Sequence, residues 1–265
     1  MKPSQEIVMR TGRLKVPSGT LFWHEAGRGE TLIFLHGAWQ DSGQWLPVMQ
    51  TLAADYHCLV PDLIGFGEST SAATVHSVDL EVEALRTLLQ ALRISRCVFV
   101  GHSLGAWVAL RYAQQHPRQV QGLALVEPEG WVNPQAVRRW RLDRWLVSPL
   151  SPLITLAAWL GGKGRQRTWQ RRRHTLRQAP AACQILFRRR LADILAEQVD
   201  PSQLPNLGAM VQIIPSPQPQ PGAPVLPMIP AEVVAAADTP LGLDEAATAT
   251  TLRQFLATIL LTPTL

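Results

Sequence analysis

The most constraining feature of the sequence is a serine between two glycines, at a point where a buried strand gives way to a helix. The apolar run Arg96–Val100 leads into Gly101–Gly105 (GHSLG), and helical spacing of apolar residues follows over Gly105–Gln115. Glycine permits the sharp turn and the close backbone approach that such a junction requires. The helix behind Ser103 directs its free amides toward any anion formed at the serine. The segment therefore predicts a serine raised into a reactive site.

Short apolar runs alternate with helical patterns through the first half of the chain, which is typical of a doubly wound, mostly parallel α/β sheet. Several runs are almost unbroken in apolar character, as expected for parallel strands buried on both faces. We expect strands at Thr20–Glu25, Thr31–Leu35, His57–Val60, Arg96–Val100 and Val120–Val126, and helices at Trp45–Ala54, Ser77–Leu92 and Gly105–Gln115.

The second half of the chain changes in character after Pro128. Residues 131–198 are arginine-rich, helical in pattern and hold five of the nine tryptophans, which predicts a helical cap inserted into a core of residues 1–130 and 199–265. Residues 201–230 carry nine of the 21 prolines and predict an extended loop. We expect further strands at Met210–Ile214 and Glu232–Ala237, and a closing helix over Asp244–Leu261.

Composition and motif spacing argue against a disordered chain, a disulfide-rich protein and a zinc protein. The 265 residues are 46% hydrophobic and 17% charged, which fits a folded chain with a sizeable core. The three cysteines are scattered through the sequence and predict buried thiols in a reducing compartment. We expect no metal site and no cofactor, because no zinc-type spacing of cysteine and histidine occurs. The amino terminus lacks an apolar signal segment, so a cytoplasmic location is expected.

Three segments in order give the chain a resemblance to the α/β-hydrolase superfamily, in its esterase, lipase and C–C hydrolase branch. They are LHGAWQDSGQW, VPDLIGFGEST and VGHSLGAW, all within Leu35–Trp107. The resemblance implies an α/β-hydrolase fold with an inserted helical cap. It also implies that Ser103 is the nucleophile and that the amides of Ala38 and Leu104 form the oxyanion site.

The chain departs from the family where the other two residues of the catalytic triad are expected. The turn after Met210–Ile214 offers no acid, and Asp238 occupies the position where the family histidine is expected. No histidine follows His174. The resemblance gives His36 a packing role, and His102 lies beside the nucleophile on a sharp turn that directs its side chain elsewhere. The remaining histidines are not expected to replace the missing base; they are His24, His57, His76, His116 and His174.

An alternative acid is available at the end of the Val120–Val126 strand. Glu127 and Glu129 lie where some branches of the family place the triad acid. An acid without a base does not complete a catalytic triad, because loss of the triad histidine typically lowers turnover by a factor of about 10⁶. The sequence therefore leaves enzymatic activity open, with a non-catalytic protein preferred.

The predicted cap carries a strongly basic segment. Between Ala136 and Arg190 lie 14 of the 25 lysines and arginines against the single acid Asp143. An uncharged, tryptophan-bearing run between basic shoulders favours an anionic membrane surface, or an acidic protein partner, over nucleic acid. The residues expected at this surface are Arg138, Arg139, Arg141, Arg144, Trp145, Trp159, Lys163, Arg171, Arg172 and Arg173.

Two hypotheses on function follow from these observations. In the first, the chain is a hydrolase-fold protein with an intact serine turn and an incomplete triad. It is then weakly active or non-catalytic, and it binds an apolar ligand, a lipid or a membrane partner through pocket and cap. In the second, it is an active serine esterase or lipase with an unconventional general base.

Overall fold

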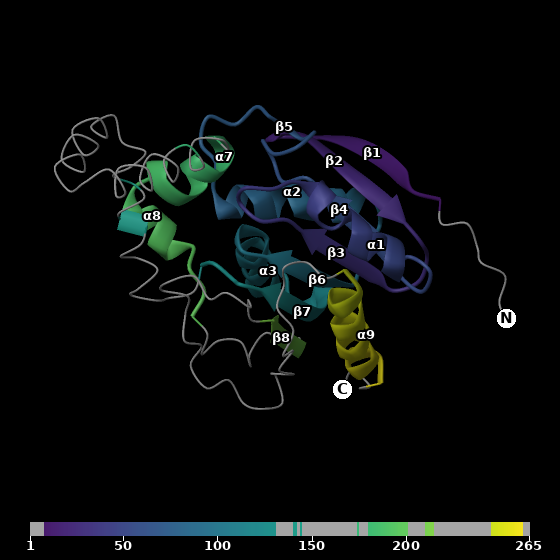
Figure 1. Ribbon diagram of the computed structural model, residues 1–265. Coiled ribbons are helices and arrows are strands. Elements are labelled where there is room, and N and C mark those ends of the chain that lie inside the picture. Colours follow the sequence, from purple (N-terminus) through teal and green to yellow (C-terminus); the bar gives the residue numbers. More distant parts are fainter. Residues whose placement is uncertain are drawn as a thin grey trace, which may run out of the picture.

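The structure, a computed structural model, describes residues 8–130, 140–141, 144, 174, 180–200, 210–214 and 245–261. A twisted sheet forms the centre of this part of the chain (Figure 1). Its strands are β1 (Arg10–Val16), β2 (Gly19–Ala26), β3 (Thr31–Leu35), β4 (His57–Pro61), β5 (Thr70–Ser71), β6 (Cys97–His102), β7 (Val120–Val126) and β8 (Met210–Ile214).

The order of strands in the sheet is β1-β2-β4-β3-β6-β7-β8, with β5 paired to β2. The pairs from β4 to β8 are parallel, whereas β2 is antiparallel to its neighbours β1 and β4. The predicted mostly parallel α/β sheet is therefore confirmed. Strand β1 was missed from the sequence, because its residues RTGRLKV are largely exposed and carry three charges instead of an apolar run.

Helices cover both faces of the sheet (Figure 1). Alternate residues of β3 point to opposite sides: Ile33 and Leu35 pack with α2 and α3, whereas Leu32 and Phe34 pack with α1 and α9. The four helices are α1 (Leu46–Leu52), α2 (Val78–Ala91), α3 (Leu104–Gln115) and α9 (Glu245–Leu261), and short 3-10 turns form at Ser42–Gln44 and Pro117–Gln119.

The start of α2 shows why this segment becomes helical where the sequence predicted it. The hydroxyl of Ser77 caps the helix by accepting a hydrogen bond from the amide of Leu80 at 3.0 Å. Asp79 and Glu81 place negative charge in the first turn, where the helix dipole favours it.

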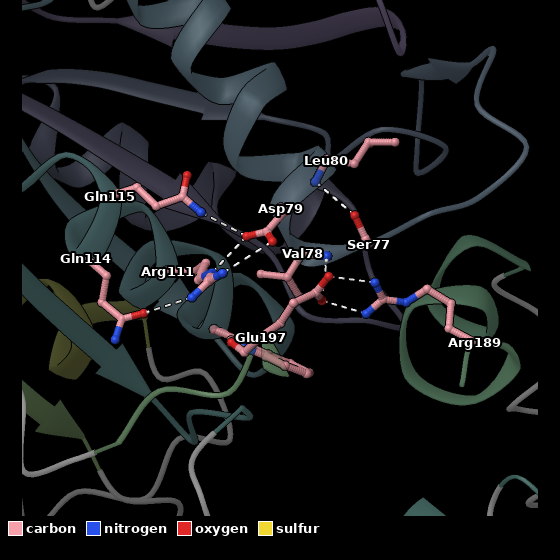
Figure 2. A network of polar contacts seen from close by, with 10 residues as sticks. Ser77, Val78, Asp79, Leu80, Arg111, Gln114, Gln115, Arg189 and Glu197 are labelled. Carbon is pink, nitrogen blue, oxygen red and sulfur yellow. Dashed lines mark hydrogen bonds and ion pairs between the residues drawn. The ribbon is translucent and has the colours of Figure 1, made fainter. Parts of the chain in front are cut away.

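The described end of the predicted cap consists of α7 (Pro180–Cys183), a π-helical turn (Gln184–Arg188) and α8 (Leu191–Ala196). Glu197 fastens this segment to the core (Figure 2). Its carboxylate accepts two hydrogen bonds from Arg189, at 2.6 and 2.5 Å, and one from the amide of Val78. Its carbonyl accepts from Trp107 Nε1 at 2.8 Å.

The two ends of the predicted insertion lie together. The amide of Val199 donates to the carbonyl of Gly130 at 2.8 Å, so the chain returns at the point where it left the end of β7. This contact agrees with an insertion over 131–198, although the division into domains stays a prediction. The expected proline-rich loop, the Glu232–Ala237 strand and Asp238 lie outside the described residues. Among described residues, no helix is long and apolar enough to span a bilayer.

Glu81 lies in the first turn of α2 and carries a carboxyl group that is buried in the protein core. The residue is fully buried, and its Oε2 accepts a hydrogen bond from the amide of Ile64 at 2.9 Å. Burial raises the pKa of this carboxyl to about 8, because removal from water disfavours the charged form. Glu81 is therefore protonated in the folded chain at neutral pH.

This raised pKa makes the stability of the fold depend on pH. Between about pH 4.5 and about pH 8 the folded chain keeps the proton that the unfolded chain releases. The free energy of unfolding therefore falls as pH rises, by up to about 1.4 kcal/mol per pH unit. Glu81→Gln removes this slope, and urea unfolding at several pH values measures it. The exposed neighbour Glu83→Gln is the control, and an unchanged slope in Glu81→Gln contradicts the assignment.

Candidate active site at the serine turn

Ser103 occupies a strained turn between β6 and α3. Its φ is 50° and its ψ is −109°, a conformation that few residues other than glycine adopt. The turn is fixed by its backbone: the amide of Ser103 donates to the carbonyl of Val126 at 2.9 Å, and its carbonyl accepts from Glu129 at 3.2 Å. Strain of this kind persists only where the surrounding structure holds it, and it is concentrated at functional sites.

The two glycines of the motif are required by contact distances. A Cβ at Gly101 lies 2.6 Å from the backbone of Ala106, and a Cβ at Gly105 lies 2.4 Å from the carbonyl oxygen of Leu35. Both distances are far below van der Waals contact. The amino-terminal turn of α3 therefore packs directly on the ends of β6 and β3, as the sequence predicted for this junction.

Two buried amides next to Ser103 are free to bind an anion. Leu35 pairs with Gly101 across β3 and β6, which brings the Gly37–Ala38 turn beside the serine. The amide of Gly37 is occupied by Gln44 Oε1 at 3.0 Å. Ala38 and Leu104 are 2% and 0% exposed, and within the described part of the chain their amides have no acceptor. Such donors suit a developing oxyanion.

Several side chains hold this loop in place. His36 is fully buried: its Nε2 accepts from the amide of Leu63 at 3.0 Å, and its Nδ1 lies 2.9 Å from the carbonyl of Gly37. Burial lowers the pKa of His36, so the imidazole is neutral, with Nδ1 as donor. Both its nitrogens are used structurally, which agrees with a packing role. Gln44 also positions this loop, because its Oε1 accepts the hydrogen bond from the amide of Gly37. Nothing in the sequence around Gln44 predicts this role.

Asp62 organises the neighbouring loop after β4. Its two carboxylate oxygens accept from the amides of Ser42 at 2.6 Å and of Glu68 at 2.8 Å. Gly67 follows with a φ of 49°, and a Cβ there lies 2.3 Å from the same carboxylate. The segment VPDLIGFGEST carries part of the family resemblance, but the sequence alone predicts no role for Asp62.

No imidazole is bonded to the serine. All seven histidines of the chain lie among the described residues, and none of them forms a hydrogen bond with Ser103 Oγ there. The imidazole of His102 lies against Gly37, with its Nδ1 2.5 Å from the position of a Cβ on that glycine, and among the described residues this nitrogen has no hydrogen-bond partner. Burial lowers the pKa of His102, with the charge of Glu127 opposing this effect.

The remaining histidines have no hydrogen bond to the serine among the described residues. His24 packs edge-on against Phe22, and His116 packs on Tyr112. His76 is buried below Gly65 and His174 is exposed. His57 bonds with Thr31 and Glu25.

The two alternative acids, Glu127 and Glu129, lie beside the Gly101–Gly105 turn, which is called the elbow from here on. Glu127 directly follows β7 with a φ of 44°, a second left-handed residue at this edge of the sheet. Among described residues its carboxylate forms no hydrogen bond or ion pair. Glu129 contacts the elbow through its amide, which donates to the carbonyl of Ser103. A triad acid must orient a histidine, and Glu127 has no imidazole bonded to it in this region.

Of the residues predicted for the basic surface, Arg141 and Arg144 are described, together with the neighbouring Trp140. Trp140 stacks on Trp107 with ring centroids 5.4 Å apart. Arg141 is exposed, and Arg144 donates to the carbonyl of Arg189 at 2.6 Å. The others lie outside the described residues: Arg138, Arg139, Trp145, Trp159, Lys163, Arg171, Arg172 and Arg173. In the part of the chain that the structure covers, no group of three or more potential ligands could hold a metal ion.

Three features together define an α/β-hydrolase fold. They are the order of the strands, the strained backbone of Ser103 between two glycines that leave no room for a Cβ, and the free amides beside the serine. The chain belongs to the Alpha/beta hydrolase family, whose profile matches residues 32–261. The match includes the three segments on which the resemblance was based and extends into α9.

Two proteins that are similar to part of this chain are an esterase and an uncharacterized protein. A pimeloyl-[acyl-carrier protein] methyl ester esterase of Vibrio atlanticus is 38% identical over 109 residues, 41% of this chain and 40% of that protein. An uncharacterized protein of Mycobacterium tuberculosis is 38% identical over 105 residues, 40% of this chain and 31% of that protein. The matched segments thus span less than half of either relative.

A solved structure shows the same fold across nearly the whole chain. A loop variant of a haloalkane dehalogenase from Bradyrhizobium elkanii superimposes with a TM-score of 0.69, covering 95% of this chain and 97% of the other at 18% identity. At this identity the likeness concerns the fold alone.

Gly105→Ala tests the packing of the elbow. The added methyl meets the carbonyl of Leu35 and forces α3 away from β3, which is expected to cost about 1–3 kcal/mol in the free energy of unfolding. Gly43→Ala is the matched control, because this glycine is exposed and its nearest neighbour is the side chain of Asp41. Urea unfolding compares the two variants. Equal stabilities contradict the close approach described above.

Proposed function

We propose that this chain binds a neutral, apolar ligand bearing a carbonyl group at the Ser103 elbow and turns it over weakly or not at all. The observation that carries the proposal is the combination of two buried amides without acceptors and a serine that has no hydrogen bond to an imidazole in the described part of the chain. The ligand carbonyl is received by the amides of Ala38 and Leu104.

The charges around the elbow favour a neutral ligand. Glu127 directly follows β7, which pairs with the strand that carries Ser103, so its carboxylate lies at the same ends of the strands as the serine. Like charges repel strongly where water is partly excluded, so a free carboxylate ligand is disfavoured. An ester or amide keeps the carbonyl oxygen that the amides require without the charge.

The weak turnover follows from the chemistry of the hydroxyl group. A serine hydroxyl is a poor nucleophile unless a base removes its proton during attack. Oxyanion donors and binding alone typically leave rates only about 10³–10⁴ above the reaction in water. Because none of the seven histidines forms a hydrogen bond with Ser103 Oγ among the described residues, this residual level is what we expect of Ser103.

An active serine hydrolase remains the second candidate. The observation in its favour is the strained backbone at both Ser103 and Glu127, which places a nucleophile and a carboxylate on adjoining turns. A related protein of Vibrio atlanticus is named as an esterase, and this suggests an ester as the substrate to test. This candidate requires a general base other than a histidine bonded to Ser103.

A fluorophosphonate probe separates the two candidates. We expect labelling of Ser103 to stay well below one equivalent under conditions that saturate an active serine hydrolase, because the hydroxyl is not activated. Intact mass spectrometry measures the labelled fraction, and Ser103→Ala gives the background. Rapid stoichiometric labelling that disappears in Ser103→Ala contradicts the proposal and supports the active hydrolase.

Ligand binding is tested in the same variants. A pyrene-labelled fatty methyl ester should bind the chain and the Ser103→Ala variant with similar affinity, because the amides and not the hydroxyl hold its carbonyl. The emission of the pyrene group reports binding. If no saturable binding occurs in either protein, the ligand-binding proposal is wrong.

We further propose that the basic segment meets an anionic membrane surface. The support is the charge asymmetry, 14 basic residues against one acid between Ala136 and Arg190, together with the uncharged run Trp145–Gly162. Each basic residue near an anionic bilayer contributes about 1 kcal/mol, so several together hold a peripheral protein. An acidic protein partner is the competing occupant.

Liposome flotation tests this second proposal. We expect the chain to float with vesicles that contain phosphatidylserine and not with pure phosphatidylcholine vesicles, and binding should weaken as salt is raised. Replacing Arg171, Arg172 and Arg173 by Gln should reduce the floated fraction several-fold. Replacing Arg10, Arg13 and Lys15, which lie on β1, is the charge-matched control. Equal binding to both kinds of vesicle contradicts an electrostatic contact.

A further inference from the structure

A hydroxyl, an imidazole and a carboxylate lie together at the amino-terminal ends of β3 and β4, whereas Ser103 follows the carboxyl-terminal end of β6. Thr31 begins β3 and pairs with His57, the first residue of β4. Thr31 Oγ1 lies 3.1 Å from His57 Nδ1, and His57 Nε2 lies 3.0 Å from Glu25 Oε1. Hydroxyl, imidazole and carboxylate are therefore joined in one chain of hydrogen bonds.

The direction of these hydrogen bonds follows from the groups themselves. An ionised carboxylate only accepts, so His57 Nε2 must carry the proton that it donates to Glu25. In the neutral imidazole the other nitrogen, Nδ1, then holds a lone pair and accepts the proton of the Thr31 hydroxyl. This is the polarity that a general base needs to activate a nucleophile, with the acid fixing the tautomer of the base.

The arrangement is accessible and separate from the elbow. The side chains of His57 and Glu25 are 18% and 36% exposed, and the preceding turn, Arg28–Glu30, lies at the surface. Ser103 lies beyond the other end of β3, roughly 15 Å away at the usual rise per residue. The amides of Gly29 and Glu30 have no acceptor in the described part of the chain, so donors are available beside Thr31.

We propose that Thr31 is an acyl acceptor, activated by His57 and Glu25, at a second reactive site that takes small acyl groups carried on a good leaving group. Thr31 Oγ1 forms a bond to the carbonyl carbon, and the bond from that carbon to the leaving oxygen breaks. The hydroxyl proton moves to His57 Nδ1 and from there to solvent, while Glu25 stabilises the imidazolium. The product is an ester of Thr31 and the released alcohol or phenolate.

The test uses p-nitrophenyl acetate on the full chain carrying Ser103→Ala, so that the elbow contributes nothing. Peptide mass spectrometry maps the acetyl group and its rate of appearance. Thr31 should be acetylated much faster than Thr70, an exposed threonine on β5 that serves as the internal reference. His57→Gln should slow acetylation of Thr31 about 10²-fold, as loss of a general base typically does. Glu25→Gln should slow it to a smaller extent.

Each outcome decides the proposal. Acetylation of Thr31 no faster than that of Thr70 overturns it, and this comparison needs no variant at Thr31. Fast acetylation that is unchanged in a folded His57→Gln variant also overturns it, because the imidazole is then not the base. Circular dichroism and thermal unfolding establish that the variants are folded. Labelling of Ser103 in the unmodified chain is scored on a different peptide, so the two sites succeed or fail independently.

Discussion

The contact between the amino-terminal turn of α3 and the carboxyl ends of β3 and β6 determines the rest of the site. Gly101 and Gly105 allow the backbones to approach to distances that any side chain would prevent. That approach forces Ser103 into a left-handed conformation and leaves the amide of Leu104 free. Because β3 and β6 are paired in register, the same contact brings Ala38 to the serine. Packing of this kind tolerates little change in volume.

The elements around the elbow serve to hold it still. His36 and Gln44 fix the Gly37–Ala38 turn through two hydrogen bonds to its backbone. Asp62 fixes the loop after β4. On the cap side, Glu197 joins Arg189, Val78 and Trp107, so the described end of the insertion is tied to the starts of both α2 and α3. These contacts hold the loops beside Ser103 in place, and hydrogen-bond donors held in place are effective at stabilising charge.

The sequence allowed the fold to be predicted because buried parallel strands and the serine turn leave strong local signals. Strands at Thr31–Leu35, Val120–Val126 and Met210–Ile214 were placed with the bounds that the structure shows. β1 was missed because it is an edge strand whose residues are largely exposed and include three charges, so it lacks the apolar run of the central strands. The roles of Gln44 and Asp62 could not be predicted, because each depends on a hydrogen bond to a backbone amide in another turn. Asp238 and most of the basic surface lie outside the described residues, so those predictions stay open.

We expect that no imidazole acts as the base for Ser103, and the pH dependence of the reaction at this serine tests that expectation. The second-order rate constant for modification of Ser103 by a fluorophosphonate should be measured across about pH 5 to 10. Without an imidazole, the rate should rise about tenfold per pH unit through the range where histidine titrates, about pH 5 to 8, as expected for attack that requires hydroxide or the alkoxide. An inflection near neutral pH followed by a plateau would contradict this expectation, because it reports a histidine that accepts the proton of Ser103.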